Sequence, residues 1–212
     1  MSKKNKTIKH IAIAGNIGAG KTTLCEKLSN HFGWEVHYED ANGNPYLSDF
    51  YDDMLRWSFN LQIYFLNSRY QQILSIQKGD KTVIQDRTIF EDAHIFAPNL
   101  HEMGLMSKRD FNNYFTLFQT MVSQIQAPDL LIYLKASIPT LVSQIQNRGR
   151  EYEGNMSLDY LKRLNDAYNK WIDGYTAGPL LIVDADNIDI RDNPEDLGKI
   201  VQMVDAQLNG LF

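Results

Sequence analysis

Cysteine is almost absent from this sequence: its 212 residues include one, Cys25. A single cysteine cannot form an internal disulfide or a cysteine-rich metal site. The chain also lacks an apolar run approaching the roughly 18 residues that a membrane-spanning helix needs. The short run 11–14 stops at a glycine and an asparagine, so it is too brief for the apolar core of a signal peptide. We expect a cytoplasmic protein that has no membrane partner.

An excess of basic residues is missing as well. The 21 lysines and arginines are outnumbered by 26 aspartates and glutamates, which gives a net charge of −5. Because a broad nucleic-acid-binding face is normally basic, we expect no nucleic-acid partner. The sequence does have a globular composition, with 43% hydrophobic and 22% charged residues. Such a chain can bury a full core, and we expect a single domain over residues 1–212.

Short β-rich runs alternate with longer stretches of helical periodicity. We expect strands at Lys9–Ala14, Glu35–Tyr38, Thr82–Gln85, Asp129–Leu134 and Pro179–Val183. The clearest predicted helices are Lys21–Phe32, Met54–Gln77, Lys108–Gln126 and Ser157–Trp171, and Ser137 with Pro139 opens a further one. Strands separated by helices indicate β-α-β crossovers. The predicted fold class is therefore α/β, with a five-stranded parallel sheet flanked by helices.

The segment between the first predicted strand and the first predicted helix is rich in glycine. Residues 15–22 read GNIGAGKT, which matches the pattern G-x-x-x-x-G-K-[ST] without a gap. In this pattern backbone amides and a helix N-terminus bind phosphates, the lysine reaches the β- and γ-phosphates, and the hydroxyl binds Mg²⁺. The alternative is a glycine turn followed by a surface lysine. We predict a site for ATP and Mg²⁺ at Gly15, Asn16, Ile17, Gly18, Ala19, Gly20, Lys21, Thr22 and Thr23.

Charged residues follow the second and third predicted strands, where ligands bind in an open α/β sheet. A kinase that phosphorylates a hydroxyl needs a carboxylate to orient and deprotonate it, cations for the transferring phosphoryl group, and Mg²⁺. Glu39 and Arg87 suit the first two tasks, and Asp86 is placed to hold the metal together with Thr22. The alternative is a solvated acidic turn at 39–40 and a structural Asp86–Arg87 pair.

A third cationic element is Arg148-Gly149-Arg150, between two predicted helices. Arginines at helix ends often serve only solvation or the helix dipole. Phosphoryl-transfer enzymes commonly close an arginine-bearing lid over the donor phosphates. We predict such a lid at about residues 146–155.

These motifs, in this order, resemble the deoxynucleoside kinases, the family of deoxycytidine, deoxyguanosine, deoxyadenosine and mitochondrial thymidine kinases. The most specific pieces are the loop Gly15–Thr23, WSFNLQ at 57–62, DRTIFED at 86–92 and RGR at 148–150, with support from NPYL at 44–47 through Tyr51. The resemblance implies a P-loop kinase fold, a homodimer, and ATP-dependent phosphorylation of a deoxynucleoside 5′-hydroxyl in nucleotide salvage.

The same resemblance implies roles for individual residues. Glu39 corresponds to the general base, Arg87 to the arginine that positions it and steadies the phosphates, and Arg148 and Arg150 to the lid arginines. Asp86 stands where the family places an acidic residue near Mg²⁺.

The resemblance also implies an acceptor site. Gln62 corresponds to the glutamine that reads the nucleobase edge. Tyr51 and a lid glutamate, Glu153 or alternatively Glu151, correspond to the pair that holds the 3′-hydroxyl. Trp57 and Phe90 could supply apolar walls, although core packing is the commoner role of such aromatics.

Two further residues, Arg69 and Asp92, bear on substrate specificity. Arg69 lies seven residues after Gln62, so these two share one face of a helix. Arg69 and Asp92 match a pair found in family members that accept purine deoxynucleosides or deoxycytidine, and thymidine-preferring members lack it. We therefore expect a purine acceptor, with deoxyadenosine ahead of deoxyguanosine. A pyrimidine nucleoside kinase is the alternative.

Two other functions compete with this interpretation. A nucleoside monophosphate kinase would need extra arginines facing the acceptor, whereas Glu39, Tyr51, Gln62 and Glu153 suit an uncharged sugar. A phosphate-loop switch or regulatory ATPase would need no helix that reads a base, and it would hydrolyse ATP slowly without regard to nucleosides. We expect the adenine of the donor near the loop 184–189.

Overall fold

The computed structural model describes residues 10–39, 43–150 and 156–210. Its strands form one parallel sheet in the order β2-β3-β1-β4-β5. The strands are β1 (His10–Gly15), β2 (Glu35–His37), β3 (Val83–Asp86), β4 (Leu130–Lys135) and β5 (Leu180–Asp184). All five expected strands are present with ends within one residue of their expected positions, and the predicted α/β class is confirmed. The expected start of the first strand at Lys9 lies outside the described residues.

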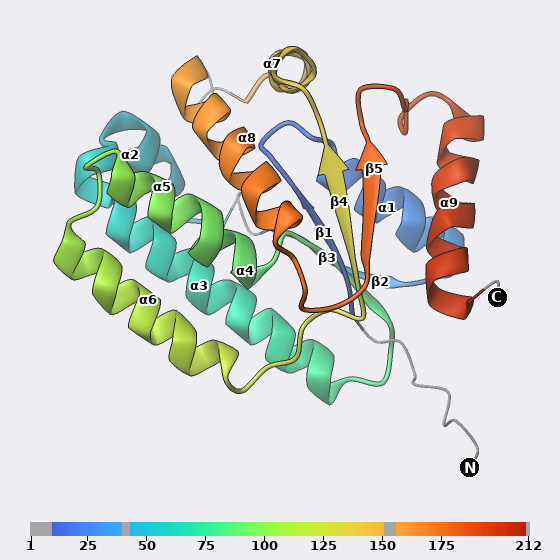
Figure 1. The fold of residues 1–212 in the computed structure, drawn as a ribbon, viewed down its shortest axis with the longest axis horizontal. Coiled ribbons are helices and arrows are strands. Elements are labelled where there is room, and N and C mark those ends of the chain that lie inside the picture. Colours follow the sequence, from blue (N-terminus) through green and yellow to red (C-terminus); the bar gives the residue numbers. More distant parts are fainter. Residues whose placement is uncertain (1–9, 40–42, 151–155, 211–212) are drawn as a thin grey trace.

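Helices cover both faces of this sheet (Figure 1). They are α1 (Lys21–Phe32), α2 (Leu47–Asp52), α3 (Met54–Lys78), α4 (Ile89–Glu91), α5 (Ala97–Glu102), α6 (Lys108–Val122), α7 (Ile138–Arg148), α8 (Leu158–Asp173) and α9 (Pro194–Asn209), with a π-helical segment η1 (Asp92–Phe96) between α4 and α5. The large group formed by α3, α5, α6 and α8 lies on one side, and α1 and α9 lie on the other (Figure 1).

The period of two along each strand sorts side chains between these layers. In β1, Ala12 and Ala14 join the core under the large helical group, whereas Ile11 and Ile13 join the core under α1 and α9. Both faces of the strand are apolar because both are covered, as is typical of parallel sheets. None of the four side chains is exposed to solvent.

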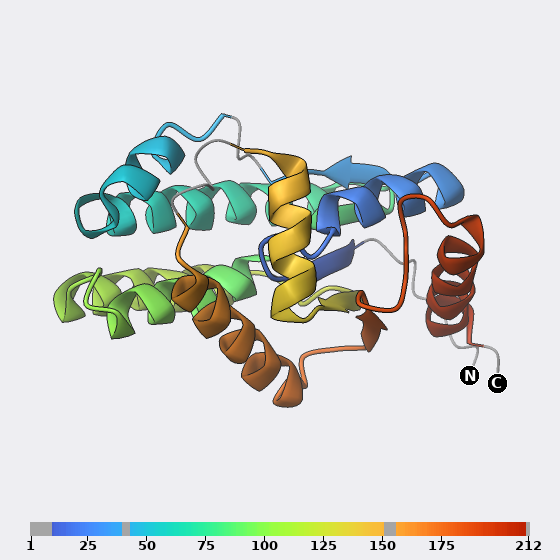
Figure 2. The ribbon, with the colours of Figure 1, turned by 90° about the horizontal axis from the view of Figure 1, so that it is seen from above.

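The carboxyl ends of the strands meet at one edge of the sheet, at the top of Figure 1. Helix α7 crosses above this edge, near the middle of the view from above (Figure 2). The loop after β1, the residues after β2 and β3, and the start of α8 therefore converge beneath or beside α7. In the part of the chain that the structure describes, no helix combines the length and apolarity needed to cross a membrane.

Candidate active site

A cavity of about 520 Å³ opens at the carboxyl edge of the sheet. The phosphate loop, the residues after β2 and β3, helices α2, α3 and α7, and the start of α8 surround it. The predicted site residues that line it are Ile17, Gly18, Gly20, Lys21, Thr22, Thr23, Glu39, Tyr51, Gln62, Asp86, Arg87, Asp92, Arg148 and Arg150. The fold thus gathers most of the residues singled out in the sequence around one space.

The phosphate loop packs tightly against α7. Gly18 adopts φ 85°, and a Cβ added there would lie 2.8 Å from the carbonyl oxygen of Leu141. Asn16 is buried, and its side-chain amide donates to the carbonyl of Leu161 at 3.1 Å and to Asn165 Oδ1 at 3.2 Å. Its side-chain amide group is therefore bound to α8, its Oδ1 accepts from the Ile17 amide at 2.8 Å, and its backbone carbonyl accepts from Lys21 Nζ at 3.0 Å.

Lys21 is buried at the base of the loop. Burial, together with the charge of Arg87, lowers the pKa of its ammonium group to about 8, against the opposing effect of Asp86 and Glu39. A phosphate placed against Lys21 would add negative charge and favour the protonated form. The lysine is thus arranged to receive an anion.

Thr22 and Asp86 present oxygen atoms beside the phosphate loop. Thr22 Oγ1 donates to Asp86 Oδ2 at 2.5 Å, and Asp86 Oδ1 is buried without a hydrogen-bond partner among the described residues. A hydroxyl and one carboxylate beside nucleotide phosphates are the donor set that Mg²⁺ uses. No cluster of three or more histidine, cysteine or acidic side chains suited to a metal occurs in residues 10–39, 43–150 and 156–210. The residues present fit a magnesium ion completed by phosphate and water.

Glu39 follows β2 and lies between two arginines. Arg69 Nη2 donates to its Oε1 at 2.8 Å, and Arg87 Nε lies 3.2 Å from the same oxygen. Burial by itself would raise the pKa of Glu39, but the charges of Arg87, Arg69 and Lys21 outweigh it and lower the pKa to about 2. The side chain is 22% exposed. Glu39 is thus an ionised carboxylate at the wall of the cavity at neutral pH.

Arg87 has an unusual backbone for a non-glycine residue, with φ 71°. Its amide donates to the carbonyl of Ile13 at 3.0 Å, and its guanidinium carbon lies 4.4 Å from the centre of the Phe96 ring. Strained backbones of this kind cluster at functional sites. Here the turn directs the arginine side chain from the end of β3 back to Glu39.

Arg69 also pairs with Asp92, because its Nε lies 3.1 Å from Asp92 Oδ2. Both side chains are almost fully buried. Burial raises the pKa of Asp92 to about 7 in spite of Arg69 and Arg87. Gln62, two helical turns from Arg69 on α3, is buried as well, and its Oε1 has no partner among the described residues. The shared face of α3 thus carries the amide of Gln62 and the guanidinium of Arg69, as the spacing predicted, and Asp92 reaches Arg69 from η1.

Apolar side chains complete the lining of the cavity. They are Ile17, Leu47, Phe50, Leu61, Phe65, Phe96 and Tyr160. Trp57 and Phe90 do not line it: the Trp57 ring lies 5.8 Å from that of Tyr46, and the Phe90 ring 6.3 Å from that of Phe118. Trp57 precedes Gln62 by five positions, roughly 140° around the helix, and its ring packs against the guanidinium of Arg56. Glu153 and Glu151 lie outside the described residues.

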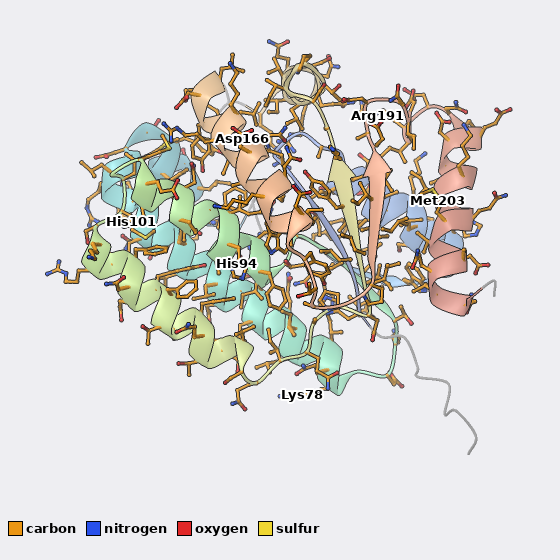
Figure 3. All side chains as sticks on the ribbon, viewed as in Figure 1. Lys78, His94, His101, Asp166, Arg191 and Met203 are labelled. Atoms are coloured by element: carbon orange, nitrogen blue, oxygen red, sulfur yellow. The ribbon has the colours of Figure 1, made fainter. Side chains whose placement is uncertain are left out.

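A second cavity of about 490 Å³ adjoins the phosphate loop between α7 and the loop after β5. Its lining includes Ala19 from the phosphate loop and residues 185–192, the region in which the donor adenine was expected. Arg191 contributes to both cavities and lies above the carboxyl end of β5 (Figure 3). The sequence analysis did not select Arg191, because a lone arginine in an acidic loop carries no motif.

Three other polar residues contact the site without having been predicted. Gln72 Nε2 donates to the carbonyl of Tyr38 at 2.9 Å, immediately before Glu39. Glu91 and Tyr168 form a buried pair at 2.8 Å beside Arg87. Gln72 could have been found by continuing the face of Gln62 and Arg69 by three residues along α3. Nothing in the local sequence distinguishes Tyr168 from a core aromatic.

Comparison with known proteins places the chain in a single kinase family. The sequence model of the family described as deoxynucleoside kinase matches residues 11–209. The deoxyadenosine/deoxycytidine kinase of Bacillus subtilis is 37% identical over 196 residues, which cover 92% of this chain and 90% of that protein. The deoxyguanosine kinase of Lactobacillus johnsonii is 35% identical over 208 residues, covering 93% of this chain and 92% of that protein.

Solved structures agree. The deoxyadenosine kinase of M. mycoides with bound dATP superposes with a TM-score of 0.82 at 29% identity, covering 92% of this chain and 98% of that one. The structure of the same kinase with dCMP and a flexible dCDP gives a TM-score of 0.83 at 30% identity, with the same coverage. The sheet and the helices around the cavity are therefore those of a P-loop kinase.

Proposed function

Because this chain belongs to the deoxynucleoside kinase family, we propose that it transfers the γ-phosphoryl group of ATP to the 5′-hydroxyl of a purine deoxynucleoside, with deoxyadenosine preferred to deoxyguanosine. The observation that carries the proposal is the position of Glu39. It is an ionised carboxylate held by Arg69 and Arg87 in the cavity that also holds Lys21 of the phosphate loop. The product would serve nucleotide salvage in the cytoplasm.

In the reaction that we propose, Glu39 accepts a hydrogen bond from the 5′-hydroxyl and finally takes its proton. The two arginines keep the carboxylate ionised and fix its direction. Arg87, Lys21, Arg148 and Arg150 place positive charge around the phosphoryl group, whose oxygens carry negative charge during in-line transfer. Thr22 and Asp86 would hold Mg²⁺, which supplies further charge neutralisation at the phosphates.

The acceptor end of the cavity suits an uncharged sugar and a base. Arg69 and Arg87 both contact Glu39, and Arg69 also contacts Asp92, so the two arginines are already paired with carboxyl groups of the protein. A monophosphate acceptor would need cations that are not committed in this way. Gln62 offers a donor and an acceptor to a base edge, and Tyr51, with Glu153 or Glu151, would bind the 3′-hydroxyl.

Purine preference rests on the Arg69–Asp92 pair and on the relatives. The pair is buried, Arg69 also contacts Glu39, and Asp92 lines the cavity together with Gln62. Relatives named for deoxyadenosine and for deoxyguanosine are 34–42% identical to this chain. The Bacillus subtilis relative is also named for deoxycytidine, so a pyrimidine acceptor is the second candidate.

We also propose that the chain is one domain that forms a homodimer through α3 and α6. These helices lie side by side (Figures 1 and 2), and they carry partly exposed apolar side chains that include Phe59, Ile63, Phe115 and Met121. Sedimentation velocity should give twice the mass of the chain. A monomer at micromolar concentration would contradict this part of the proposal.

The proposed reaction is tested by ADP release with ATP and Mg²⁺ against each of four deoxynucleosides and each of their monophosphates. We expect turnover with deoxyadenosine and deoxyguanosine and none with monophosphates. Exchange of Arg69 and Asp92 together for small apolar residues should shift preference toward thymidine. Unchanged purine selectivity in that variant would remove the pair from the specificity argument.

A further inference from the structure

A buried carboxylate beside Arg87 has no task in the proposed chemistry. Glu91 lies on α4 with none of its side chain exposed. It accepts hydrogen bonds from the Thr88 amide at 2.6 Å, from the Tyr168 hydroxyl at 2.8 Å and, at 3.4 Å, from the amide of Gly15. All three donors are neutral. Burying a carboxylate among neutral donors costs free energy of folding. We therefore look for a role of Glu91 in holding those donors in place.

The donors belong to three separate parts of the site. Gly15 begins the phosphate loop, Thr88 follows Arg87 in the turn after β3, and Tyr168 is on α8. Glu91 therefore ties the phosphate loop and the Arg87 turn to α8.

Tyr168 extends this arrangement to the side chain of Arg87. Arg87 Nη1 lies 3.4 Å from the Tyr168 oxygen, and the Tyr168 hydroxyl donates to Glu91 Oε1. Chemistry fixes the direction of both hydrogen bonds: a guanidinium can only donate, so the Tyr168 oxygen accepts from Arg87 and its own proton is directed to Glu91. Burial, and the neighbouring Glu91, raise the pKa of the Tyr168 hydroxyl well above its usual value, so the hydroxyl keeps its proton.

The Arg87 guanidinium is thus held from three directions. Glu39 Oε1 lies 3.2 Å from its Nε, the Tyr168 oxygen lies on the Nη1 side, and the Phe96 ring lies against its plane. Contacts in three directions leave a planar group little rotational freedom. They also hold a backbone that departs from the conformations preferred by non-glycine residues.

We propose that Glu91 and Tyr168 are positioning residues for phosphoryl transfer, which hold Arg87 at the angle that places its guanidinium between Glu39 and the transferring group. The proposal rests on the function proposed above and assigns work to residues that line neither of the two cavities. A misdirected Arg87 would lose charge stabilisation in the transition state while ground-state binding of the substrates stays the same.

The chain offers a closely matched pair of variants for the test. Tyr168→Phe removes the hydroxyl between Arg87 and Glu91. Tyr133→Phe removes a hydroxyl that contacts Asn169 Oδ1 at 3.4 Å, from a buried ring whose centre lies 5.9 Å from that of Tyr168. Each variant loses one phenolic oxygen from the stacked rings of Tyr133 and Tyr168, and only the Tyr168 oxygen contacts Arg87.

We expect Tyr168→Phe to lower kcat about tenfold relative to Tyr133→Phe, the effect of losing one oriented hydrogen bond, with KM for ATP and for the nucleoside changed less than about twofold. Glu91→Gln should also lower kcat, because an amide presents one acceptor oxygen where three donors converge. The double variant should fall no further than the lower single variant, since both changes release the same arginine.

Equal kcat values for Tyr168→Phe and Tyr133→Phe would overturn the proposal, as would a rise in both KM values at unchanged kcat. Independent, multiplicative losses in the double variant would also contradict it. Wild-type turnover in the same assay tests the proposed function separately, so failure of one is distinguishable from failure of the other.

Discussion

Glu39 shows how neighbouring charge decides what a single residue can do. Burial alone would favour its protonated form, yet three cations lower its pKa to about 2. The carboxylate that we propose as the base is therefore ionised over the whole pH range in which ATP-dependent kinases work. The same ion pairs fix the direction of its oxygens.

Glu39→Gln should retain ATP binding and lose kcat by roughly 10²–10⁴-fold, because an amide cannot take the proton from the 5′-hydroxyl. ATP binding by calorimetry and turnover by ADP release would show this. Glu35→Gln is the matched control, since Glu35 begins β2, the strand that Glu39 follows, is exposed, and pairs with the surface Lys81 and with His37 instead of the site arginines. Turnover of Glu39→Gln within a few-fold of that control would remove Glu39 from the role of base.

At this scale the sequence predicts residues whose positions follow from strand ends. Glu39, Asp86 and Arg87 could be found because parallel strands point their carboxyl ends at one edge. Glu91 and Tyr168 could not, because their importance depends on contacts across 77 positions of the chain. Trp57 differs from its expected position, because its ring packs against Tyr46 and the guanidinium of Arg56 and does not line the cavity.

The phosphate loop and α7 act together at the scale of elements. Gly18 has no Cβ, and this absence lets the loop approach the backbone of α7 at Leu141. The sequence motif has a glycine at this position so that backbone amides can approach the phosphates. In the structure, the same glycine also allows α7, the helix that leads to Arg148, to pack against the loop.

Gly18→Ala should raise the KM for ATP at least about tenfold, because the new methyl group would lie 2.8 Å from a backbone oxygen and force the loop or α7 to move. Gly33→Ala provides the control. Gly33 also has a positive φ of 73°, and an added Cβ there meets nothing within 4 Å. That variant should lose about 1 kcal/mol of stability and keep its KM. Equal KM values for the two variants would contradict the packing argument.

The elements differ in how well the sequence predicts them. Helices α1, α3 and α8 begin and end within about two residues of their predicted bounds, because long amphipathic periodicity is a strong signal. The run from α4 through η1 to α5 was not predicted. Its π-helical turn breaks the 3.6-residue period and places Asp92 and Phe96 at the cavity together.

At the scale of the whole molecule, a chain of hydrogen bonds crosses from the start of β1 to the residue before Glu39. His10 Nε2 lies 2.8 Å from Gln85 Oε1, Gln85 Nε2 donates to Gln72 Oε1 at 2.8 Å, and Gln72 donates to the Tyr38 carbonyl. Burial lowers the pKa of His10 to about 4, although Gln85 and Asp129 oppose this. The neutral ring is thus part of the folded core.

This histidine makes stability depend on pH. The unfolded chain regains a histidine pKa near 6.5, so between pH 6.5 and 4 the unfolded state binds more protons and stability falls as pH falls. Urea unfolding gives the free energy of unfolding at pH 7.5 and at pH 5. The decrease between these two pH values should be about 2 kcal/mol smaller in His10→Gln than in the wild type. His31→Gln, which changes an exposed histidine, should keep the wild-type loss. Identical losses in all three proteins would contradict a buried neutral His10.

The central claim is that this chain phosphorylates the 5′-hydroxyl of a purine deoxynucleoside, and one competition tests it most directly. The protein is given ATP, Mg²⁺ and an equimolar mixture of the four deoxynucleosides and their four monophosphates, with the nucleosides isotopically labelled, and the products are identified by mass spectrometry. We predict labelled dAMP as the first product, followed by dGMP, with ADP formed in equal amount. Labelled thymidine monophosphate alone, diphosphates of the unlabelled monophosphates, or ADP without any phosphorylated acceptor would contradict the account.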